Sequence, residues 1–456
     1  MTVVATESEW SSEFPRSWKL PIIGNTLEMA KDPARFFFDC YRKYGPVFRV
    51  NVLGRTHTVI AGAEAANFMG TREGREALRS KEFWEGLVDE YGAERTLTGE
   101  DGEMHLRLRA IMKRGYSRES IKGRYSELID ISDVSIDRDW KPGGLVPVVQ
   151  AMQYMVTEQL GQILTGVAPL EYVKDIRTTI LYILNVLVTR QRPKFLLRNP
   201  EYKRAKARVF ELGQEMIARY HAKKARADDT ARNFVDDVME AHEREPDLMP
   251  ASDLVLTLTG PYVAGLDTVA NTTAACIYAV LKHPDVLARV HQEVDAFFAS
   301  GPIEEDKVFR ELPVMNGAIM EAMRLYPIAV AQMRTAARDF TFCGRQIHEG
   351  EMLFVGTSVP HFMEENFPRP ETFDVDRYEK PRAEHLKPGV YSPYGRGPHL
   401  CLGKSLADVQ MLLTMARIFH KLDLSLERPG YVLKTKTAPT PGPSMDFKVR
   451  VNGLRH

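Results

Sequence analysis

The chain has 456 residues, of which 44% are hydrophobic, so it is long and apolar enough to bury a large core. Its 61 basic and 61 acidic residues balance, and this neutrality gives no indication of a nucleic-acid partner. The four cysteines are far apart and form no CxxC pair, which argues against a disulfide framework or a structural zinc site. This cysteine usage favours a reducing compartment, and we expect a cytoplasmic, soluble protein with at most peripheral membrane contact.

We expect no targeting signal in the first residues of the sequence. Residues 1–20 carry three glutamates and no long apolar run, which predicts neither a signal peptide nor a membrane anchor. Residues 1–30 are expected to form a loop. A short helix is predicted over 32–44, followed by a hairpin of β-branched strands at 47–52 and 56–62.

Helices are predicted for most of the middle of the chain, residues 63–298, with strong apolar periodicity at 171–190 and 200–225. Residues 339–355 indicate strand, turn and strand, and alternating segments follow from residue 424. We expect the N- and C-terminal strand segments to meet in one small β region. No linker or repeat divides the chain, so the expected fold class is mainly α with small β-sheets.

A first pair of candidate binding residues is His105 and Arg109. They are four residues apart and therefore share one helix face. Two hydrogen-bond donors on one face suit a pair of carboxylates. The alternative is an exposed basic helix, which is the simpler interpretation of this pair alone.

The apolar helix predicted from about residue 254 to 281 contains an acid beside an alcohol, Asp267 and Thr268. A threonine hydroxyl can bond to an upstream carbonyl and open the helix locally, which leaves room for a small molecule. The alternative is a back-bonded Thr268 and an Asp267 paired with a basic neighbour. Gly260-Pro261 predicts a kink or an interruption of this helix.

A predicted helix that ends at Pro327 carries Glu321 and Arg324, three residues apart on one face. In isolation the pair is best explained as an exposed ion pair of little consequence.

Cys401 lies in a glycine-rich loop, YSPYGRGPHLCLG, that leads directly into a helix predicted over 405–421. Free N–H groups at a helix start stabilise a thiolate and lower the cysteine pKa. Cys401 is therefore a candidate nucleophile or metal ligand, against the alternative of an inert buried cysteine.

The segment YGRGPHLCLG resembles the haem-binding loop of the cytochrome P-450 superfamily, F-G-x-G-x-[HR]-x-C-x-G. Tyr394 replaces the usual phenylalanine, and its hydroxyl needs a partner if it is buried. Similarity to the family extends in order from LPIIGN, residues 20–25, to beyond the cysteine helix. The resemblance implies one catalytic domain over 1–456, with the cytochrome P-450 fold and haem between the helix of Thr268 and the Cys401 helix.

The resemblance also implies roles for individual residues. Cys401 would be the axial ligand of the iron of haem b. Asp267 and Thr268, in AGLDT, match the oxygen-activation motif. Arg377, in RPETFDVDRY, would join Glu321 and Arg324 in a structural cluster. The residues expected to contact the haem propionates are His105, Arg109, Arg334 and His399.

The activity implied is monooxygenation of a lipophilic substrate, with electrons from a ferredoxin or flavodoxin and its NAD(P)H reductase. The alternatives are a peroxide-dependent or isomerising haem-thiolate enzyme, and a haem-binding sensor without turnover. Apolar residues at 328–333, Ala264, the loop before Thr98 and the turn at 437–444 are expected to line the substrate pocket. Basic residues expected near the cysteine side, as a docking patch or simply as solvated surface, are Lys113, Arg114, Arg118, Lys122, Arg396 and Lys404.

Overall fold

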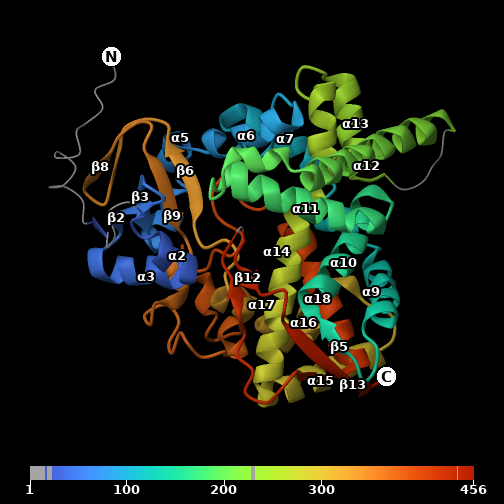
Figure 1. Ribbon diagram of the computed structural model, residues 1–456. Coiled ribbons are helices and arrows are strands. Elements are labelled where there is room, and N and C mark those ends of the chain that lie inside the picture. Colours follow the sequence, from blue (N-terminus) through green and yellow to red (C-terminus); the bar gives the residue numbers. More distant parts are fainter. Residues whose placement is uncertain (1–15, 18–22, 227–231, 439) are drawn as a thin grey trace.

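The computed structural model describes residues 16–17, 23–226, 232–438 and 440–456 (Figure 1). Most of the acidic N-terminal segment, residues 20–22 of LPIIGN and residue 439 of the expected 437–444 turn lie outside the described residues.

Helices make up most of the described chain and lie mainly to one side, right of the larger sheet in Figure 1. The helices before the centre of the chain are α2 (Thr26–Lys31), α3 (Pro33–Tyr44), α4 (Ala63–Phe68), α5 (Arg72–Ala77), α6 (Lys81–Tyr91), α7 (Gly102–Lys113), α8 (Arg118–Ile121), α9 (Tyr125–Asp139), α10 (Val148–Leu160) and α11 (Val173–Ile183). Those that follow are α12 (Pro200–Ala225), α13 (Phe234–Arg244), α14 (Leu254–Lys282), α15 (Pro284–Ala299), α16 (Val308–Glu311), α17 (Pro313–Leu325) and α18 (Lys404–Lys421).

The strands form small sheets. The larger sheet has the order β1-β2-β3-β9-β6-β4, and a three-stranded sheet has the order β10-β13-β5. Two short hairpins, β7–β8 and β11–β12, complete the described strands. The strand bounds are β1 (Arg16–Ser17), β2 (Val47–Val52), β3 (Arg55–Ala61), β4 (Leu78–Arg79), β5 (Leu145–Pro147), β6 (Gln332–Ala336), β7 (Phe340–Phe342), β8 (Arg345–Ile347), β9 (Met352–Gly356), β10 (Leu422–Leu426), β11 (Thr435–Lys436), β12 (Gly442–Pro443) and β13 (Lys448–Leu454).

The expected union of N- and C-terminal strands is wrong. β13 pairs antiparallel with β10 and β5, whereas β2 and β3 pair with each other and β3 pairs with β9. The reason is the burial of β13: Val449 and Val451 pack into the helical core, while Val50 and Val59 of the hairpin belong to a separate cluster with α3. Each pair of strands therefore covers a different apolar surface.

Two other predicted elements differ in detail. The loop expected over residues 1–30 is replaced from residue 26 by α2. The helix expected at 171–190 divides into a 3₁₀ turn, α11 and a π-helical turn at Leu184–Val188. The Thr189 hydroxyl donates to the Leu184 carbonyl, five residues earlier, at 2.8 Å. In a regular α-helix the Leu184 carbonyl would instead accept a hydrogen bond from the backbone N–H four residues later.

The helix α14 runs through the middle of the molecule and is not interrupted at Gly260-Pro261, contrary to one of the expected outcomes (Figure 1). It packs against α10, α12, α17 and α18. These contacts outweigh the loss of about 3 kcal/mol that an internal proline causes in a helix. Residues Ala251–Lys282 are long and apolar enough to cross a membrane, but 78% of the apolar window is buried within the protein. This burial is typical of a core helix.

The structure brings Glu321, Arg324 and Arg377 together with no exposed side-chain surface. Arg324 donates to both Glu321 oxygens at 2.8 Å, and Arg377 Nε donates to Glu321 Oε1 at 3.0 Å. The Tyr378 hydroxyl donates to Oε2 at 2.6 Å. The exposed ion pair weighed from the sequence is therefore not what the protein forms.

This cluster is joined to the cysteine loop through His361. Arg324 Nη1 donates to the His361 carbonyl at 2.6 Å, and the Ser392 N–H donates to His361 Nε2 at 3.1 Å. The Tyr391 hydroxyl also donates to the Met320 carbonyl on α17, at 2.9 Å. The start of the cysteine loop is thus held to α17 by hydrogen bonds on both sides.

We predict that Arg377→Met lowers the free energy of unfolding by about 3–5 kcal/mol, because it leaves buried carboxylates at Glu321 and Glu384 short of a partner. The matched control, Arg289→Met, removes the exposed pair with Asp376 and should cost less than about 1 kcal/mol. Urea unfolding followed by circular dichroism measures both. Equal losses in the two variants would contradict the structural role of the buried cluster.

The stability of the protein should fall as the pH is lowered below about 6.5, because burial lowers the pKa of His361 to about 3 and the charge of Arg324 acts in the same direction. The unfolded chain takes up a proton that the folded chain does not. Stability from this group is complete above the unfolded pKa and is lost progressively between about pH 6.5 and pH 3, at about 1.4 kcal/mol per pH unit. Urea midpoints measured from pH 7 to pH 5 test this.

His361→Gln should lower the free energy of unfolding at pH 7. It should also reduce the dependence of stability on pH by about 1.4 kcal/mol per pH unit, the contribution of one proton. His221→Gln, which replaces an exposed histidine of α12, is the matched control and should leave the slope as it is. A slope that survives His361→Gln undiminished would rule out His361 as its source.

Candidate functional site

The cysteine loop is a tight turn in front of α18. The Cys401 N–H donates to the Tyr394 carbonyl at 3.0 Å, and the Leu400 N–H donates to the Gly397 carbonyl at 3.1 Å. Gly397 has a φ of 74°, and a Cβ there would lie 2.5 Å from the Met69 carbonyl oxygen. Only glycine fits this position. Cys401 therefore precedes the first turn of α18 and is an exposed residue, although protein groups surround its sulfur.

The environment of the Cys401 thiol pulls its pKa in opposite directions. Burial raises the pKa, whereas the Gly403 N–H and the charges of Arg109 and Lys404 lower it, and the charge of Asp408 raises it. The lowering groups are those that stabilise a thiolate. Burial is the largest of these effects, so the pKa of the Cys401 thiol is raised overall, and the lowering expected from the helix start does not prevail. A cation bound to the sulfur would therefore be needed to hold it as a thiolate.

Tyr394 has the partner that its hydroxyl needs. The hydroxyl donates to Asp408 Oδ1 at 2.6 Å, and Lys404 Nζ donates to Asp408 Oδ2 at 2.6 Å. The Lys404 ammonium also lies 5.0 Å from the Tyr394 ring centroid. Burial raises the pKa of Tyr394 well above its ordinary value, so the phenol stays protonated. The substitution of tyrosine for phenylalanine is therefore accommodated by two residues of α18.

Arg334 and His399 lie on either side of Asp101. His399 Nε2 is 2.8 Å from Asp101 Oδ1, and burial lowers the pKa of His399 while the bond to Asp101 raises it. Arg334, on β6, is buried and donates to the Met333 carbonyl and to Gln332 Oε1. Burial lowers its pKa to about 10. Arg334 has no carboxylate within 4.0 Å among the described residues.

His105 and Arg109, on α7, both contact the cysteine loop. The two ring nitrogens of His105 lie 3.0 Å from the Leu97 carbonyl oxygen and 3.1 Å from that of Pro398. Arg109 Nη2 donates to the Leu400 carbonyl at 2.7 Å. The ring centroids of His105 and His399 are 4.1 Å apart. The structure thus gathers the four predicted donors around the loop, with His105 and Arg109 engaged by carbonyl groups.

One strip of α14 remains accessible although most of the helix is buried. Gly260, Ala264 and Thr268 are four residues apart and retain exposure, and Ala264 and Thr268 are the most exposed. The Thr268 hydroxyl donates to the Ala264 carbonyl at 2.7 Å. Small side chains on one face of a helix that packs against α18 leave space beside that face.

Asp267 faces away from this strip. It is buried, and Gln153 Nε2 of α10 donates to its Oδ1 at 2.6 Å. Lys436 Nζ of β11 lies 3.9 Å from Oδ2. Thr268 is therefore back-bonded and Asp267 is paired with a base, which is the alternative arrangement weighed from the sequence.

Sequence reasoning missed four residues that hold these groups: Asp101, Gln153, Asp408 and Lys436. Asp101 precedes His105 by one helical turn, and Asp408 follows Lys404 at the same spacing, so both had a local signal. Gln153 and Lys436 had none, because their contacts to Asp267 join distant parts of the chain.

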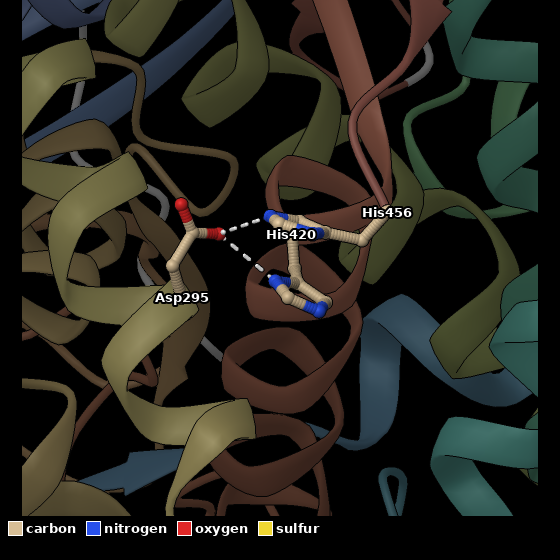
Figure 2. A group of neighbouring side chains, drawn as sticks. All are labelled: Asp295, His420 and His456. Carbon is tan, nitrogen blue, oxygen red and sulfur yellow. Dashed lines mark hydrogen bonds and ion pairs between the residues drawn. The ribbon is translucent and has the colours of Figure 1, made fainter.

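A separate group of metal-ligating side chains joins α15, α18 and the segment after β13 (Figure 2). His420 Nδ1 and His456 Nε2 lie 2.9 Å and 3.4 Å from the same oxygen of Asp295, whose other oxygen accepts from Arg455. The two rings are stacked, with centroids 4.4 Å apart and planes 14° apart. An imidazole lone pair lies in the plane of its ring, so parallel stacked rings do not direct both nitrogens at one ion. The cluster is a hydrogen-bonded tie between three segments.

Comparison with known proteins agrees with this geometry. The family described as Cytochrome P450 matches residues 15–442. The chain is 32% identical over 177 residues to a sterol 14alpha-demethylase of Mycolicibacterium vanbaalenii, a match that spans 38% of this chain and 39% of that protein. It is 25% identical over 397 residues to the putative cytochrome P450 139 of Mycobacterium tuberculosis, covering 85% and 90% of the two chains.

The fold is similar to that of retinoic acid-bound cyanobacterial CYP120A1, with a TM-score of 0.80 at 22% identity over 96% of this chain and 99% of that chain. The family match spans most of the sequence and includes every residue placed around the cysteine loop. The chain therefore belongs to the cytochrome P450 family of haem-dependent monooxygenases.

Proposed function

We propose that the protein is a haem b-thiolate monooxygenase that inserts one atom of dioxygen into a lipophilic substrate. The observation that carries this proposal is the place of the exposed residue Cys401 at the start of α18, with the Gly403 N–H and the charge of Arg109 beside its sulfur. A nucleophilic cysteine would need a general base in contact with it, and no hydrogen bond joins Cys401 Sγ to a histidine or carboxylate among the described residues.

The residues present fit a flat, anionic metal cofactor. The buried guanidinium of Arg334 lacks a carboxylate partner within 4.0 Å, which is a costly state for a cation unless an anion binds there. The small residues Ala264 and Gly260 leave one face of α14 open. Cys401 would hold the iron, and Arg334 and His399, with His105 and Arg109 after exchange of their carbonyl contacts, would hold the propionates.

Bound haem supplies the iron chemistry that activates dioxygen. The chain contributes a proton path on the α14 side. The Thr268 Oγ1–H, now donated to the Ala264 carbonyl, can turn toward the open strip, and Asp267 can replace the proton that Thr268 passes on. The Glu321 cluster keeps the cysteine loop in place and takes no part in proton transfer.

The substrate is proposed to be lipophilic because most of the residues expected to line the pocket are apolar. Ala264 and Ala329 are exposed, and Ile328, Ala331 and Met333 are half-buried. The relatives named above include a sterol demethylase and a retinoic acid complex, which supports the same class.

Electrons are proposed to come from a ferredoxin or flavodoxin with its NAD(P)H reductase. On the cysteine side, Arg118, Arg396 and Lys404 line a pocket of about 710 Å³ together with Leu400 and Tyr394. Such a basic concavity suits an acidic partner. Of the basic residues considered, Arg114 pairs with Asp237, Lys122 with Asp306 and Lys404 with Asp408, so these three contribute less free charge. Reducing-type cysteine usage supports a cytoplasmic location.

The thiolate assignment is tested by the reduced carbon-monoxide spectrum of the purified holoenzyme. The wild type should show the red-shifted band of a thiolate-ligated haem, and Cys401→Ser should lose it because an alcohol donates far less electron density. Cys343→Ser, which alters an exposed cysteine elsewhere, should keep the band. A wild-type spectrum without that band would overturn every haem-thiolate function for this chain.

Turnover then separates the monooxygenase from its alternatives. A screen of sterols, terpenoids and fatty acids for a low- to high-spin shift supplies a substrate. Incorporation of ¹⁸O from ¹⁸O₂ with a ferredoxin system supports the proposal. Product formed only with hydrogen peroxide, a rearranged product without oxygen, or spectral change without product would each favour an alternative.

With that substrate, Thr268→Ala should lower the product formed per NAD(P)H consumed by about tenfold, because the proton held at Thr268 Oγ1 is lost. Thr272→Ala is the matched control. Thr272 lies one turn after Thr268 on the same helix face, its hydroxyl donates to the Thr268 carbonyl, and it is buried whereas Thr268 is exposed. Equal coupling in wild type and Thr268→Ala would remove Thr268 from the mechanism.

A further inference from the structure

The two oxygens of Asp267 have different partners. Oδ1 accepts a short hydrogen bond from Gln153 on α10, at 2.6 Å. Oδ2 has no hydrogen-bond partner and is buried, with Lys436 Nζ 3.9 Å away. An acid buried to this extent needs a defined source of charge or protons. The nearest one is the lysine.

Lys436 is held in place by the hairpin β11–β12. Lys436 pairs with Gly442 across the hairpin, and β12 packs against α14. A Cβ on Gly442 would lie 2.5 Å from Asn271 Cγ, so the hairpin backbone touches α14 one turn beyond Asp267. Neither polar atom of the Asn271 amide has a partner. The hairpin and α14 thus enclose a polar region on the side of the helix away from Thr268.

Lys436 also reaches solvent. Its side chain is 20% exposed, whereas that of Asp267 is 5% exposed. Burial lowers the pKa of Lys436, the charge of Asp267 raises it, and the charge of Arg177 on α11 lowers it. A lysine in this position can release a proton more readily than a fully solvated one.

We propose that Asp267 receives its protons from solvent through Lys436, so that the proton path enters the site at the β11–β12 hairpin, with Gln153 as a positioning residue. The proposal rests on the monooxygenase function above, because only a reaction that consumes protons needs this supply. It assigns a role to two residues outside the acid–alcohol motif.

The transfer is balanced without a further reactant. Rotation of the lysine side chain closes the 3.9 Å gap, an Nζ–H bond of Lys436 breaks and an O–H bond forms at Asp267 Oδ2. The neutral amine regains a proton from solvent water. Gln153 holds Oδ1 while Oδ2 is protonated, which keeps the carboxyl group turned toward the hairpin. Delivery to Thr268 then requires the protonated carboxyl group to leave Gln153 and rotate toward the hydroxyl of that residue.

Four variants of the holoenzyme test this route. Lys436→Met removes the proton source, and Lys436→Arg keeps the charge but not a releasable proton. Lys434→Met is the matched control, an exposed lysine two residues earlier on the same hairpin. Asp267→Asn removes the acceptor. Product formed per NAD(P)H should fall by about tenfold in both Lys436 variants and stay at the wild-type value in Lys434→Met.

A readout independent of turnover is the titration of Lys436 itself. Lysines are reductively methylated with ¹³C-formaldehyde, and the spectrum of the diamagnetic ferrous carbon-monoxide form is followed with pH; Lys436→Arg identifies the signal. We expect the Lys436 midpoint below the ordinary lysine value, because burial disfavours the ammonium, and lower still in Asp267→Asn, because the carboxylate that favours the ammonium is gone.

Wild-type coupling in Lys436→Arg would reduce the lysine to a fixed charge and overturn the route, as would equal coupling in Lys436→Met and Lys434→Met. A Lys436 midpoint unaffected by Asp267→Asn would break the link between the two groups. If the wild-type enzyme incorporates no oxygen, the proposed monooxygenase function is overturned. If only the proton route is wrong, the wild-type enzyme still turns over its substrate, so the two failures can be told apart.

Discussion

The buried carboxylate of Glu321 is the interaction on which the cysteine side of the site depends. Removing a carboxylate and two guanidinium groups from water is costly, and the geometry must return that cost through hydrogen bonds. Here Arg324 binds both oxygens, Arg377 and Tyr378 each bind one, and the remaining guanidinium N–H groups donate to backbone carbonyls such as Pro368 and Pro370. The cluster fixes α17 against the segment around residues 368–378. The Glu321 cluster therefore acts by positioning the backbone, because it determines where the chain turns before the cysteine loop.

That position is passed to Cys401 by groups that have little freedom. His361 accepts from the Ser392 N–H and can do so only as a neutral ring, which burial enforces. The loop then closes on itself through the Cys401 N–H and the Tyr394 carbonyl, and Tyr394 is tied to α18 through Asp408. The sulfur is consequently presented at one fixed place. A ligand atom that must stay on one metal through many turnovers benefits from such preorganisation.

The sequence predicted what depends on local spacing. The cysteine at the start of a helix, the pairing of Glu321 with Arg324 and the helix over 200–225 follow from residues within a few positions of each other. What it did not predict depends on packing between distant segments. The partner strands of β13, the continuity of α14 through Pro261 and the partners of Asp267 are each decided by which apolar surfaces meet, and no short pattern encodes that.

The observed positions of Asp267 and Thr268 show that the two interpretations of their sequence motif do not exclude each other. A back-bonded threonine and a paired acid were set against a functional acid–alcohol motif, but the structure allows both. The Thr268 hydroxyl keeps its proton on the Ala264 carbonyl, and Gln153 keeps Asp267 turned toward the hairpin. An uncontrolled proton supply would waste electrons, so a resting state that holds both groups away from the open strip is compatible with activity. The cysteine side is fixed by fully paired charges, whereas the α14 side retains an Asp267 oxygen and an Asn271 amide that have no hydrogen-bond partner. Motion is therefore expected on the α14 side, because rearrangement there breaks few hydrogen bonds, while the same movement near Glu321 would expose a buried charge.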